Sequence, residues 1–358
     1  MEKFRVLTIP NDPLEAYDRK GYSHEERHSY FNPNHEFDVT LLGVEETNQE
    51  EFTYAGFRVI PSDRSLSNIN KIVREVKPHL IKGENGNWAS ELSAKIGRTH
   101  NIPSLTTVHD RFPSEEVGLV DKIICVSDEV KRRCIEKGAR DGNCVIIDNG
   151  TDLQVFNDYR GSKRVDELLN MYSGNPRILS VGRLTWEKNL ENLFMASKKA
   201  KEFFPDLTHI HIGRYGELRE QLDKIVKDWD IHHLHFLPNQ KQVDLPFFYS
   251  WADAFTMASL SEGFGIVYIE ALSCETPVLT SNRLPMSLIV QDSYNGVLVD
   301  PESSQSICDG FYKLFSNKVF YLSLKSVARE SVKKYDINLS KKKEAELYKS
   351  LIKQHEKK

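Results

Sequence analysis

The sequence predicts an α/β protein built from two doubly wound domains. Short strand-like runs alternate with helix-length amphipathic stretches almost throughout, which is typical of βα units whose parallel sheet is covered on both faces. A polar, poorly periodic stretch from Thr151 to about Asn175 interrupts the alternation. At about 150 residues per domain, 358 residues suffice for two domains. We therefore expect an N-terminal domain at residues 1–165 and a C-terminal domain at residues 170–335.

The first half is expected to form one parallel sheet. Its strand-like runs are Phe4–Ile9, Phe37–Leu42, Phe57–Ile60, Leu80–Lys82, Ser104–Val108, Lys122–Val126 and Cys144–Ile147. Apolar residues at helical spacing predict helices at Leu66–Val76 and Trp88–Ile96. The tail at about 336–358 also keeps apolar residues at helical spacing, so we expect a helix that packs back on the N-terminal domain.

The second half repeats this alternation. Its strand-like runs are Ile178–Val181, His209–Ile212, Leu234–Phe236, Ala254–Met257, Pro277–Thr280 and Val297–Val299. In doubly wound folds, ligands bind in the crevice outside the carboxyl ends of the strands. Residues that directly follow a strand are therefore the candidates for a functional site.

Composition narrows the class of protein. With 48 Lys and Arg against 52 Asp and Glu, a net charge of −4 argues against nucleic acid as the partner. A hydrophobic content of 39% excludes wholesale disorder. No apolar run approaches the ~18 residues of a membrane-spanning helix, and the first ten residues are typical of a strand rather than a secretory signal. Five scattered cysteines without a CxxC pair favour a reducing cytoplasm over a disulfide framework or a cysteine zinc site.

The strongest motif is the segment Ser261–Leu272, just after a predicted strand. Gly263 and Gly265 permit a tight turn, and the following residues open a helix whose N–H groups favour an anion. Glu262 in the turn and Glu270 in the helix would take distinct positions about one ligand. The alternative is that Glu262 caps a helix and Glu270 is a buried, hydrogen-bonded carboxylate.

Cations and a histidine follow two further strands. Arg183 and Lys188 lie at a helix start, where the dipole disfavours cations unless they share a multiply charged anion such as a diphosphate. A solvated surface pair is the alternative. His109 follows the run Ser104–Val108 and could hydrogen-bond a sugar hydroxyl, although a loop histidine is more often structural.

Taken together, these residues resemble the retaining glycosyltransferases of family 4 (glycosyl transferases group 1), which have the GT-B fold. The matching segments are Val181–Leu184, Glu187–Asn189, Glu262–Gly265, Glu270–Ala271, Pro277–Ser281, Ile147–Asp152 with Phe156, and Asn295–Val299. The resemblance implies two facing Rossmann-like domains with an interdomain cleft. The N-terminal domain would bind the acceptor and the C-terminal domain the nucleotide sugar.

The resemblance also implies an activity. A UDP- or GDP-sugar would give its sugar, with retention, to a hydroxyl of a glycan, lipid-linked or small-molecule acceptor in cell-surface polysaccharide or glycoconjugate synthesis. Glu262 and His109 would be the catalytic residues, Arg183 and Lys188 would hold the diphosphate, and Glu270 would bind the ribose. The other donor-site candidates are Gly263, Phe264, Gly265 and Ile266 near sugar and phosphate, Gly213, Arg214, Leu237 and Pro238 near the base, and Asn149.

No metal or cofactor is expected, since the nucleotide sugar is a substrate. The enzyme would be cytoplasmic or peripherally bound at the inner face of the membrane, and no oligomeric state is predicted. The chain departs from the family at Gly21, the remaining glycine where many relatives carry a Gly-Gly loop, and at Glu275, where glycine is common. A nucleotide-sugar 2-epimerase and a catalytically silent binding subunit of the same fold remain alternatives.

Two further patterns suggest metal sites but have simpler interpretations. Asp228 and Asp230 form a DxD sequence at the end of an amphipathic helix, which favours a structural role. Several histidines alternate along two predicted strands and could share a face, although strand histidines are commonly packing or surface residues. These are His209, His211, His232, His233 and His235.

Overall fold

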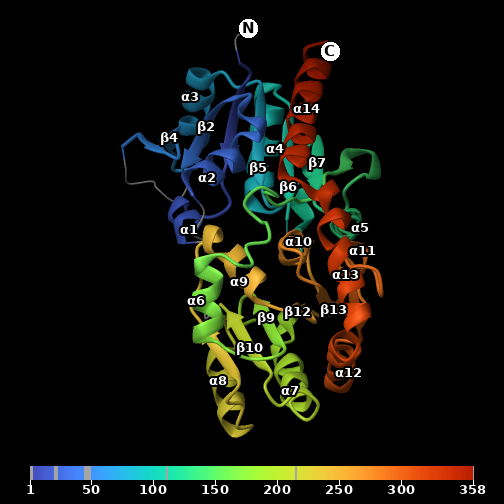
Figure 1. Cartoon of the computed structure of the whole chain (residues 1–358). Coiled ribbons are helices and arrows are strands. Elements are labelled where there is room, and N and C mark those ends of the chain that lie inside the picture. The colour runs from blue at the N-terminus through green and yellow to red at the C-terminus, as the bar shows by residue number, and fades with distance from the viewer. Residues whose placement is uncertain (1–2, 20–22, 44–49, 110–111, 214–215, 358) are drawn as a thin grey trace. The chain divides into compact units, whose positions relative to one another are not determined.

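The structure is a computed structural model that describes residues 3–19, 23–43, 50–109, 112–213 and 216–357 (Figure 1). The chain divides into two compact units. Unit 1 comprises Met1–Asn149 and Asn338–Lys358, and unit 2 comprises Gly150–Ile337. Unit 1 is therefore discontinuous in sequence, because its last segment follows the whole of unit 2.

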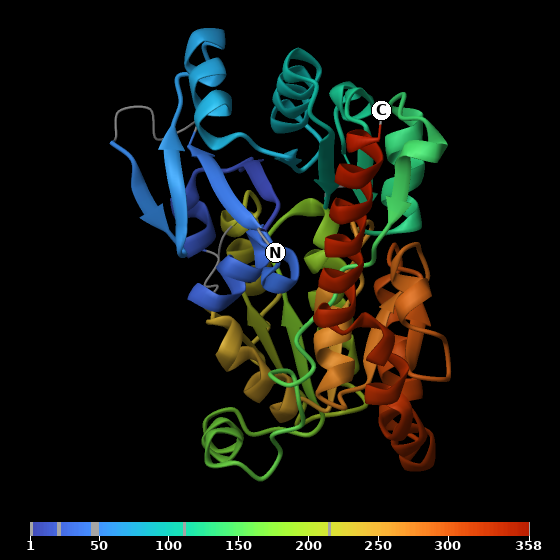
Figure 2. The same cartoon turned by 90° about the horizontal axis from the view of Figure 1, so that it is seen from above.

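Unit 1 is an α/β unit whose sheet has the strand order β3-β4-β2-β1-β5-β6-β7-β8. All described neighbours pair in parallel except β3 with β4. The strands are β1 (Arg5–Ile9), β2 (Asp38–Gly43), β3 (Phe52–Tyr54), β4 (Phe57–Pro61), β5 (Leu80–Glu84), β6 (Ser104–Val108), β7 (Lys122–Cys125) and β8 (Cys144–Ile146). The helices are α1 (Leu14–Arg19), α2 (His24–Phe31), α3 (Leu66–Val76), α4 (Trp88–His100), α5 (Asp128–Glu136) and α14 (Ile337–Glu356). Figure 2 shows α14, in red, beside the teal strands of this unit.

Unit 2 is a parallel sheet of order β11-β10-β9-β12-β13-β14. The strands are β9 (Arg177–Val181), β10 (Thr208–Ile212), β11 (Leu234–Leu237), β12 (Ala254–Met257), β13 (Val278–Ser281) and β14 (Gly296–Val299). The helices are α6 (Lys163–Met171), α7 (Leu190–Ala200), α8 (Arg219–Asp228), α9 (Leu245–Trp251), α10 (Ile266–Ser273), α11 (Met286–Ile289), α12 (Ser304–Phe315) and α13 (Lys318–Ser331). Along the chain, β9, β10 and β11 extend the sheet in one direction, and β12, β13 and β14 then extend it in the other direction, starting beside β9. The topological switch point therefore lies between β9 and β12.

The boundary between the units differs from the expected one. The polar stretch after Asn149 is bonded into unit 2 and is not a free linker. Tyr159 donates its backbone N–H to Ser250 Oγ at 2.9 Å, and Arg160 donates to Thr276 Oγ1 at 3.0 Å. The polarity of this stretch predicted a linker. The sequence pattern could not reveal its hydrogen bonds, because the partners of these groups lie about a hundred positions away in the sequence.

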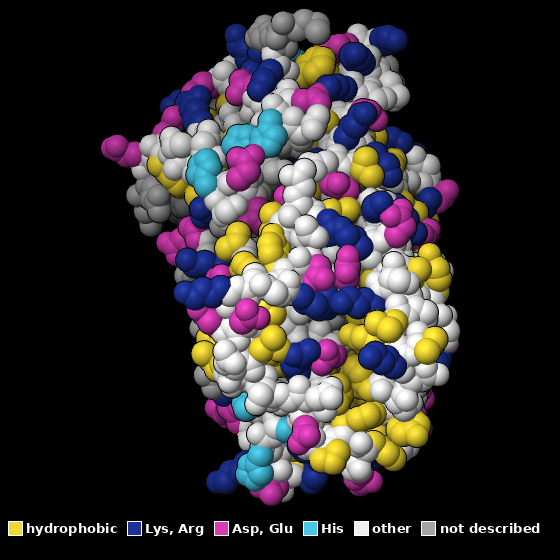
Figure 3. Space-filling model, viewed as in Figure 1, with side chains coloured by type: hydrophobic (Ala, Val, Ile, Leu, Met, Phe, Trp, Pro, Cys, Tyr) yellow, Lys and Arg dark blue, Asp and Glu magenta, His cyan; other side chains and the backbone are white. Residues whose placement is uncertain are grey.

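The surface carries mixed charge. On the face in Figure 3, Lys and Arg side chains alternate with Asp and Glu, in keeping with the nearly balanced composition. Within the described part of the chain, no helix combines the length and the apolar character needed to cross a bilayer.

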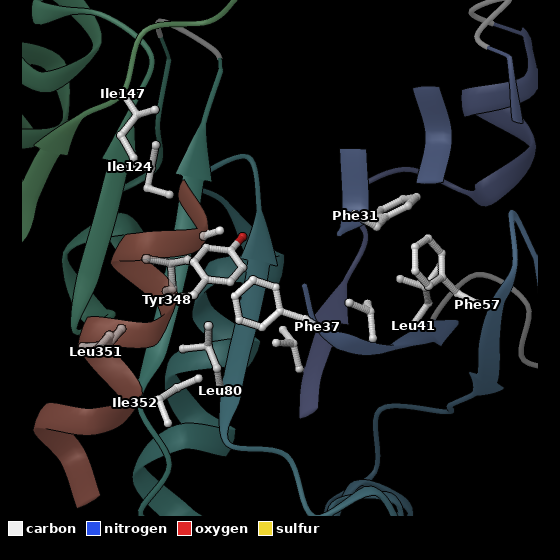
Figure 4. Close-up of a cluster of buried hydrophobic side chains, with 14 of the residues drawn as sticks. Phe31, Phe37, Leu41, Phe57, Leu80, Ile124, Ile147, Tyr348, Leu351 and Ile352 are labelled. Atoms are coloured by element: carbon white, nitrogen blue, oxygen red, sulfur yellow. The ribbon is translucent and has the colours of Figure 1, made fainter. Parts of the chain in front are cut away.

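The core of unit 1 lies on both faces of its sheet. Alternate residues of a strand point to opposite faces, so Val6 packs with the cluster under α14, whereas Leu7 packs with α3 and α4. Figure 4 shows Tyr348, Leu351 and Ile352 of α14 beside the side chains of the sheet. Burial on both faces explains why these strands are continuously apolar rather than alternating.

A cluster of charged side chains is buried at the end of this α14 interface. Lys82 and Glu84 are neighbours on one face of β5, and Glu344 comes from α14; their side chains are 2%, 1% and 9% exposed. Lys82 Nζ lies 2.9 Å from Glu84 Oε1 and 3.1 Å from Glu344 Oε1. Tyr348 donates its hydroxyl to Glu344 at 2.6 Å. Lys341 Nζ is 3.2 Å from Glu344 Oε2. We call these five residues the buried charge cluster.

The charges in this cluster set each other's pKa. Burial alone would lower the pKa of Lys82, but Glu344 and Glu84 raise it well above its ordinary value. Burial alone would raise the pKa of Glu344, but Lys341 and Lys82 lower it. Burial dominates for Glu84 and raises its pKa. The cluster is therefore held together by opposite charges, and Lys82, Glu84 and Glu344 are almost entirely shielded from water.

Candidate functional site

The predicted site residues of unit 2 lie in the loops that follow β9 and β12. These strands are neighbours, with Leu179 in register with Phe255, so their loops leave the same edge of the sheet at the topological switch point. Two hydrogen bonds join the loops. Leu260 N donates to Glu187 O at 2.8 Å, and Asn189 Nδ2 donates to Ala258 O at 3.0 Å.

Lys188 and Glu262 meet where the two loops join. Lys188 Nζ lies 2.7 Å from Glu262 Oε1 and 2.9 Å from Oε2. Ser259 Oγ donates to Glu262 Oε1 at 2.7 Å. The two charged side chains are only 15% and 11% exposed, so they do not form a solvated surface pair. A charge-assisted contact of this kind is short, strong and fixed in geometry.

Arg183 is held much less firmly. Its side chain is 74% exposed, and its Nη2 lies 3.5 Å from Glu187 Oε1. Exposed pairs of this type contribute about 0–1 kcal/mol to stability. The alternative of a solvated surface cation therefore fits Arg183 better than it fits Lys188. Because its ion pair is weak, Arg183 can move toward a ligand at little cost in free energy.

The glycine turn leads directly into α10. Gly265 occupies the N-cap position with φ 104°, a left-handed conformation that favours glycine. A Cβ there would lie 2.6 Å from the Tyr268 ring. Tyr268 in turn donates its hydroxyl to Met257 O at 3.0 Å, which ties α10 to the end of β12. Of the other predicted residues, Phe264 is buried and packs on Tyr335, Ile266 opens the helix, and Gly263 precedes Phe264 in the turn.

Glu270 is buried in the middle of α10, and both of its oxygens accept hydrogen bonds. Gln242 Nε2 donates to Oε1 at 2.9 Å, and the Tyr249 hydroxyl donates to Oε2 at 2.8 Å. This matches the alternative of a buried, hydrogen-bonded carboxylate. A carboxylate oxygen can accept more than one hydrogen bond, so these donors orient Glu270 without excluding a ribose hydroxyl.

The predicted base site lies at the ends of β10 and β11. Gly213 N donates to Leu237 O at 3.1 Å, and Pro238 follows Leu237 in the chain. A Cβ on Gly213 would lie 2.1 Å from the Gly182 carbonyl oxygen, so only glycine fits this approach of β10 to β9. Arg214 lies outside the described residues.

Two predicted residues belong to unit 1. His109 follows β6; its backbone N–H donates to Asn85 Oδ1 at 3.4 Å, and its ring stacks on Tyr30 with centroids 6.0 Å apart. Asn149 is the last residue of the first segment of unit 1. The residues that the structure brings together are those of unit 2, and the roles of His109 and Asn149 stay predictions.

The histidines of unit 2 differ in the side chains that they contact. His209 and His211 on β10 both contact Ser180, His233 contacts Ser197, and the other two are His232, paired with Asp230, and His235, packed on Tyr172. In the described ranges, no three His, Cys, Asp or Glu side chains are placed to hold a metal. The shared strand face that we considered for a metal site instead holds hydrogen-bonded histidines.

These buried histidines predict acid sensitivity. Burial lowers the pKa of His211 to about 4 and that of His209 well below its usual value. An unfolded histidine titrates near 6.5, so below this pH the unfolded state binds protons that the folded state does not. The free energy of unfolding should fall by up to ~1.4 kcal/mol per pH unit and per histidine as the pH drops from about 6.5 toward 4. Urea titrations at pH 7, 6 and 5 measure this slope.

The variant that tests this prediction is His209→Gln, which should make the pH slope shallower. A slope equal to that of the unchanged protein would show that His209 does not titrate as described.

Sequence reasoning missed several residues of this site. Ser259 directly follows the loop residue Ala258 after β12, so the rule of strand carboxyl ends could have found it. Gln242 and Tyr249 could not be found in this way, because they come from a separate segment and reach Glu270 only in the fold.

With the geometry established, comparison with known proteins identifies the domain. Residues 163–334 match the family model described as glycosyl transferases group 1. Unit 2 carries a glycosyl transferases group 1 domain. The match spans β9 to β14 and includes both loops that hold Lys188 and Glu262.

Curated relatives of this group 1 domain are glycosyltransferases. The chain is 29% identical over 62% of its length to D-inositol 3-phosphate glycosyltransferase of Nocardiopsis dassonvillei, of which the match covers 53%. It is 25% identical over 85% of its length to UDP-Gal:alpha-D-GlcNAc-diphosphoundecaprenol alpha-1,3-galactosyltransferase of Escherichia coli, of which the match covers 87%. For several relatives the chain spans only about half of the relative's length, as with the Nocardiopsis protein.

Solved structures similar to the whole chain have the GT-B fold. HepE of Anabaena in complex with UDP has a TM-score of 0.80 at 18% identity, with 97% of this chain and 100% of that chain covered. Sucrose-phosphate synthase of Thermosynechococcus elongatus has a TM-score of 0.76 at 17% identity, with 98% and 100% covered. At these identities the likeness shows the fold alone. The predicted fold class is confirmed as GT-B, with two Rossmann-like units.

Proposed function

We propose that the chain is a retaining glycosyltransferase that uses a nucleoside-diphosphate sugar. The observation that carries the proposal is the Lys188–Glu262 pair, held by loops from β9 and β12 at the topological switch point of the group 1 domain. A fixed cation at the place where ligands bind in such sheets suits a diphosphate. The N-terminus of α10, just beyond Glu262, favours the same negative charge.

The proposed reaction needs no covalent intermediate on a side chain. The bond between the anomeric carbon and the phosphate oxygen breaks, and the acceptor oxygen bonds to the same face of that carbon. The proton of the acceptor hydroxyl passes to the leaving phosphate oxygen. Lys188 and the exposed cation Arg183 would stabilise the charge that develops on the diphosphate, and Glu262 would hold the sugar beside it. Their two positive charges are the reason that we propose no metal or cofactor.

The remaining roles follow from the family resemblance and are part of the proposal. We assign the acceptor to unit 1, with His109 near the sugar, and the ribose to Glu270. The acceptor is a glycan, lipid-linked or small-molecule hydroxyl. A lipid-linked acceptor has support in the Escherichia coli relative, whose name specifies a diphosphoundecaprenol acceptor. For such an acceptor the protein would work in the cytoplasm at the inner face of the membrane.

Calorimetric titration with UDP, GDP and ADP in the presence of EDTA tests the donor site. We expect one nucleotide to bind with a micromolar dissociation constant. Lys188→Ala should weaken that binding by roughly 10- to 150-fold, through the loss of charge-assisted contacts of about 1.5–3 kcal/mol. Arg183→Ala should have a smaller effect, since its side chain is exposed.

Lys313→Ala is the matched control, because Lys313 is an ion-paired cation of unit 2 whose partner, Asp292, lies outside the candidate site. Its affinity should equal that of the unchanged protein. Failure of all three nucleotides to bind would favour a silent subunit. Binding that returned only when Mg²⁺ or Mn²⁺ was added would contradict the metal-free proposal.

A further inference from the structure

Beneath the candidate site, three side chains form a buried hydrogen-bonded chain that ends on the backbone of the site. In the sheet, His211 of β10 is in register with Ser180 of β9, and His209 is its neighbour on the same face. Ser180 Oγ lies 2.9 Å from His209 Nε2 and 2.8 Å from His211 Nδ1. His211 Nε2 lies 3.2 Å from the Gly182 carbonyl oxygen. We call Ser180, His209 and His211 the histidine–serine chain; all three are fully buried.

The hydrogen bonds of the histidine–serine chain have a single direction. A carbonyl oxygen can only accept, so His211 carries its proton on Nε2 and donates to Gly182 O. Its neutral Nδ1 must then accept, which makes the Ser180 hydroxyl the donor to it. The Ser180 oxygen in turn accepts from His209 Nε2–H. His209 Nδ1 is then unprotonated and can only accept a hydrogen bond. In agreement with this, it has no hydrogen-bond partner among the described residues.

Both histidines are neutral in this arrangement. Burial lowers the pKa of each, and the nearby charged or titratable groups that act on His209 are the other histidines His211, His233 and His235. Phe194 of α7 closes the opposite side, with its ring centroid 5.8 Å from both imidazoles. The proton order is therefore fixed over the ordinary pH range.

The end of the histidine–serine chain is placed to control the donor loop. Gly182 is the first residue after β9, and its N–H still makes the last sheet bond, to Ile212 O at 3.0 Å. Its carbonyl belongs to the peptide group that joins it to Arg183. Because a peptide group is planar, fixing the carbonyl also fixes the direction of the Arg183 N–H and the start of the loop toward Lys188. Lys188 is close by, since a Cβ on Gly182 would lie 3.7 Å from its Cδ.

We propose that His211 is a positioning residue of the donor site, which holds the Gly182 carbonyl so that the loop from Arg183 to Lys188 is set for a diphosphate. Ser180 and His209 act behind it by fixing the tautomer of His211. The ligand-binding part of this inference rests on the proposed function, whereas the orientation of the peptide group does not.

Two variants of His211 separate positioning from packing. Glutamine places an amide nitrogen near the position of Nε2 and can still donate to Gly182 O. Asparagine is shorter and reaches only the position of Nδ1, so it can contact Ser180 but not Gly182. Both variants remove the buried ring, so a purely structural role predicts similar losses of stability and of function for the two.

The first readout is nucleotide binding by calorimetry, with whichever of UDP, GDP and ADP binds the unchanged protein. We expect His211→Asn to weaken binding about tenfold, the effect of losing one buried hydrogen bond, and His211→Gln to stay within about threefold of the unchanged protein. Thermal unfolding of both variants is measured alongside. Equal affinities of the two variants, at temperatures where both are folded, would overturn the proposal.

The second readout needs no ligand and therefore survives a failure of the proposed function. Labelling glycine with ¹³C at the carbonyl and arginine with ¹⁵N gives NMR correlations only for Gly-Arg pairs. The sequence has three of these, Gly97–Arg98, Gly182–Arg183 and Gly213–Arg214. The Gly182 signal is the one lost in Arg183→Lys, and Gly97 in unit 1 is the internal reference.

We expect the Gly182 carbonyl signal to shift in His211→Asn and to stay near its original position in His211→Gln. Equal shifts in the two variants, or none in either, would refute the hydrogen bond from His211. If the unchanged protein binds no nucleotide but the carbonyl signal responds as expected, the proposed function fails and the orientation of the peptide group by His211 stands.

Discussion

Replacing Lys82 with methionine should lower the free energy of unfolding by roughly 3–5 kcal/mol at pH 7, because it leaves buried carboxylates without their shared cation. Glu84 and Glu344 both depend on Lys82, at 2.9 and 3.1 Å. Urea unfolding followed by circular dichroism measures the loss. The loss should shrink as the pH is lowered, since protonation then neutralises the carboxylates that Lys82 no longer balances.

Lys341→Met is the matched control for this prediction. Lys341 also pairs with Glu344, but its side chain is 16% exposed and water can partly replace it, so we expect a smaller loss. A combined Lys82→Met and Glu84→Gln variant should recover part of the stability, because it removes one buried charge of each sign. A loss below about 1 kcal/mol for Lys82→Met would contradict the charged state of the cluster.

Replacing Glu262 with glutamine should separate binding from turnover. Glutamine keeps the shape of the side chain but frees the charge of Lys188, which pairs with Glu262 at 2.7 Å. We expect nucleoside diphosphate to bind as tightly as before or more tightly, while turnover falls by about 10²–10³-fold, the usual cost of losing a fixed electrostatic contact to the reacting group. Release of nucleoside diphosphate from the sugar nucleotide, with water as acceptor, measures turnover without a known acceptor.

Two comparisons make this experiment decisive. Lys188→Ala should lose both binding and turnover, because it removes the cation and leaves Glu262 as a partly buried negative charge facing the diphosphate. Glu302→Gln, at an exposed carboxylate paired with Arg283, should change neither. Unchanged turnover in Glu262→Gln would remove Glu262 from the reaction, and a loss of affinity as large as that of Lys188→Ala would make it a binding residue instead.

Local sequence pattern predicted the α/β class with two doubly wound units, and it drew attention to Lys188 and Glu262 as candidates, whereas the GT-B fold was implied by the family resemblance. Runs of apolar residues located the strands of both sheets except β3, a short edge strand that pairs antiparallel with β4. The rule that ligands bind at strand carboxyl ends selected Lys188 and Glu262 from the amino-acid sequence alone. Neither prediction requires knowledge of which distant segments meet.

Several of the features that sequence reasoning missed depend on distant contacts. In the sequence, Lys82 resembles an ordinary polar residue at a strand end. Its burial could not be predicted, because its partner Glu344 lies 262 positions away in the chain. The boundary of unit 2 was misplaced for the same reason, since the stretch at 150–165 owes its order to residues near 250 and 275. The alternation of His209 and His211 could be read from the sequence. Their hydrogen bonds could not be predicted, because both bind Ser180 in the neighbouring strand.

The discontinuity of unit 1 reverses the usual order of events during synthesis on the ribosome. Domains generally fold in the order in which they emerge, the N-terminal one first. Here the apolar face under α14 and the Lys82–Glu84 pair emerge early, but Glu344 and Tyr348 follow only after all of unit 2. At roughly 5–20 residues per second, the wait lasts on the order of ten seconds or more. Unit 2 can therefore complete its fold first, and unit 1 must remain unfinished until α14, which supplies the second carboxylate partner of Lys82, has been translated.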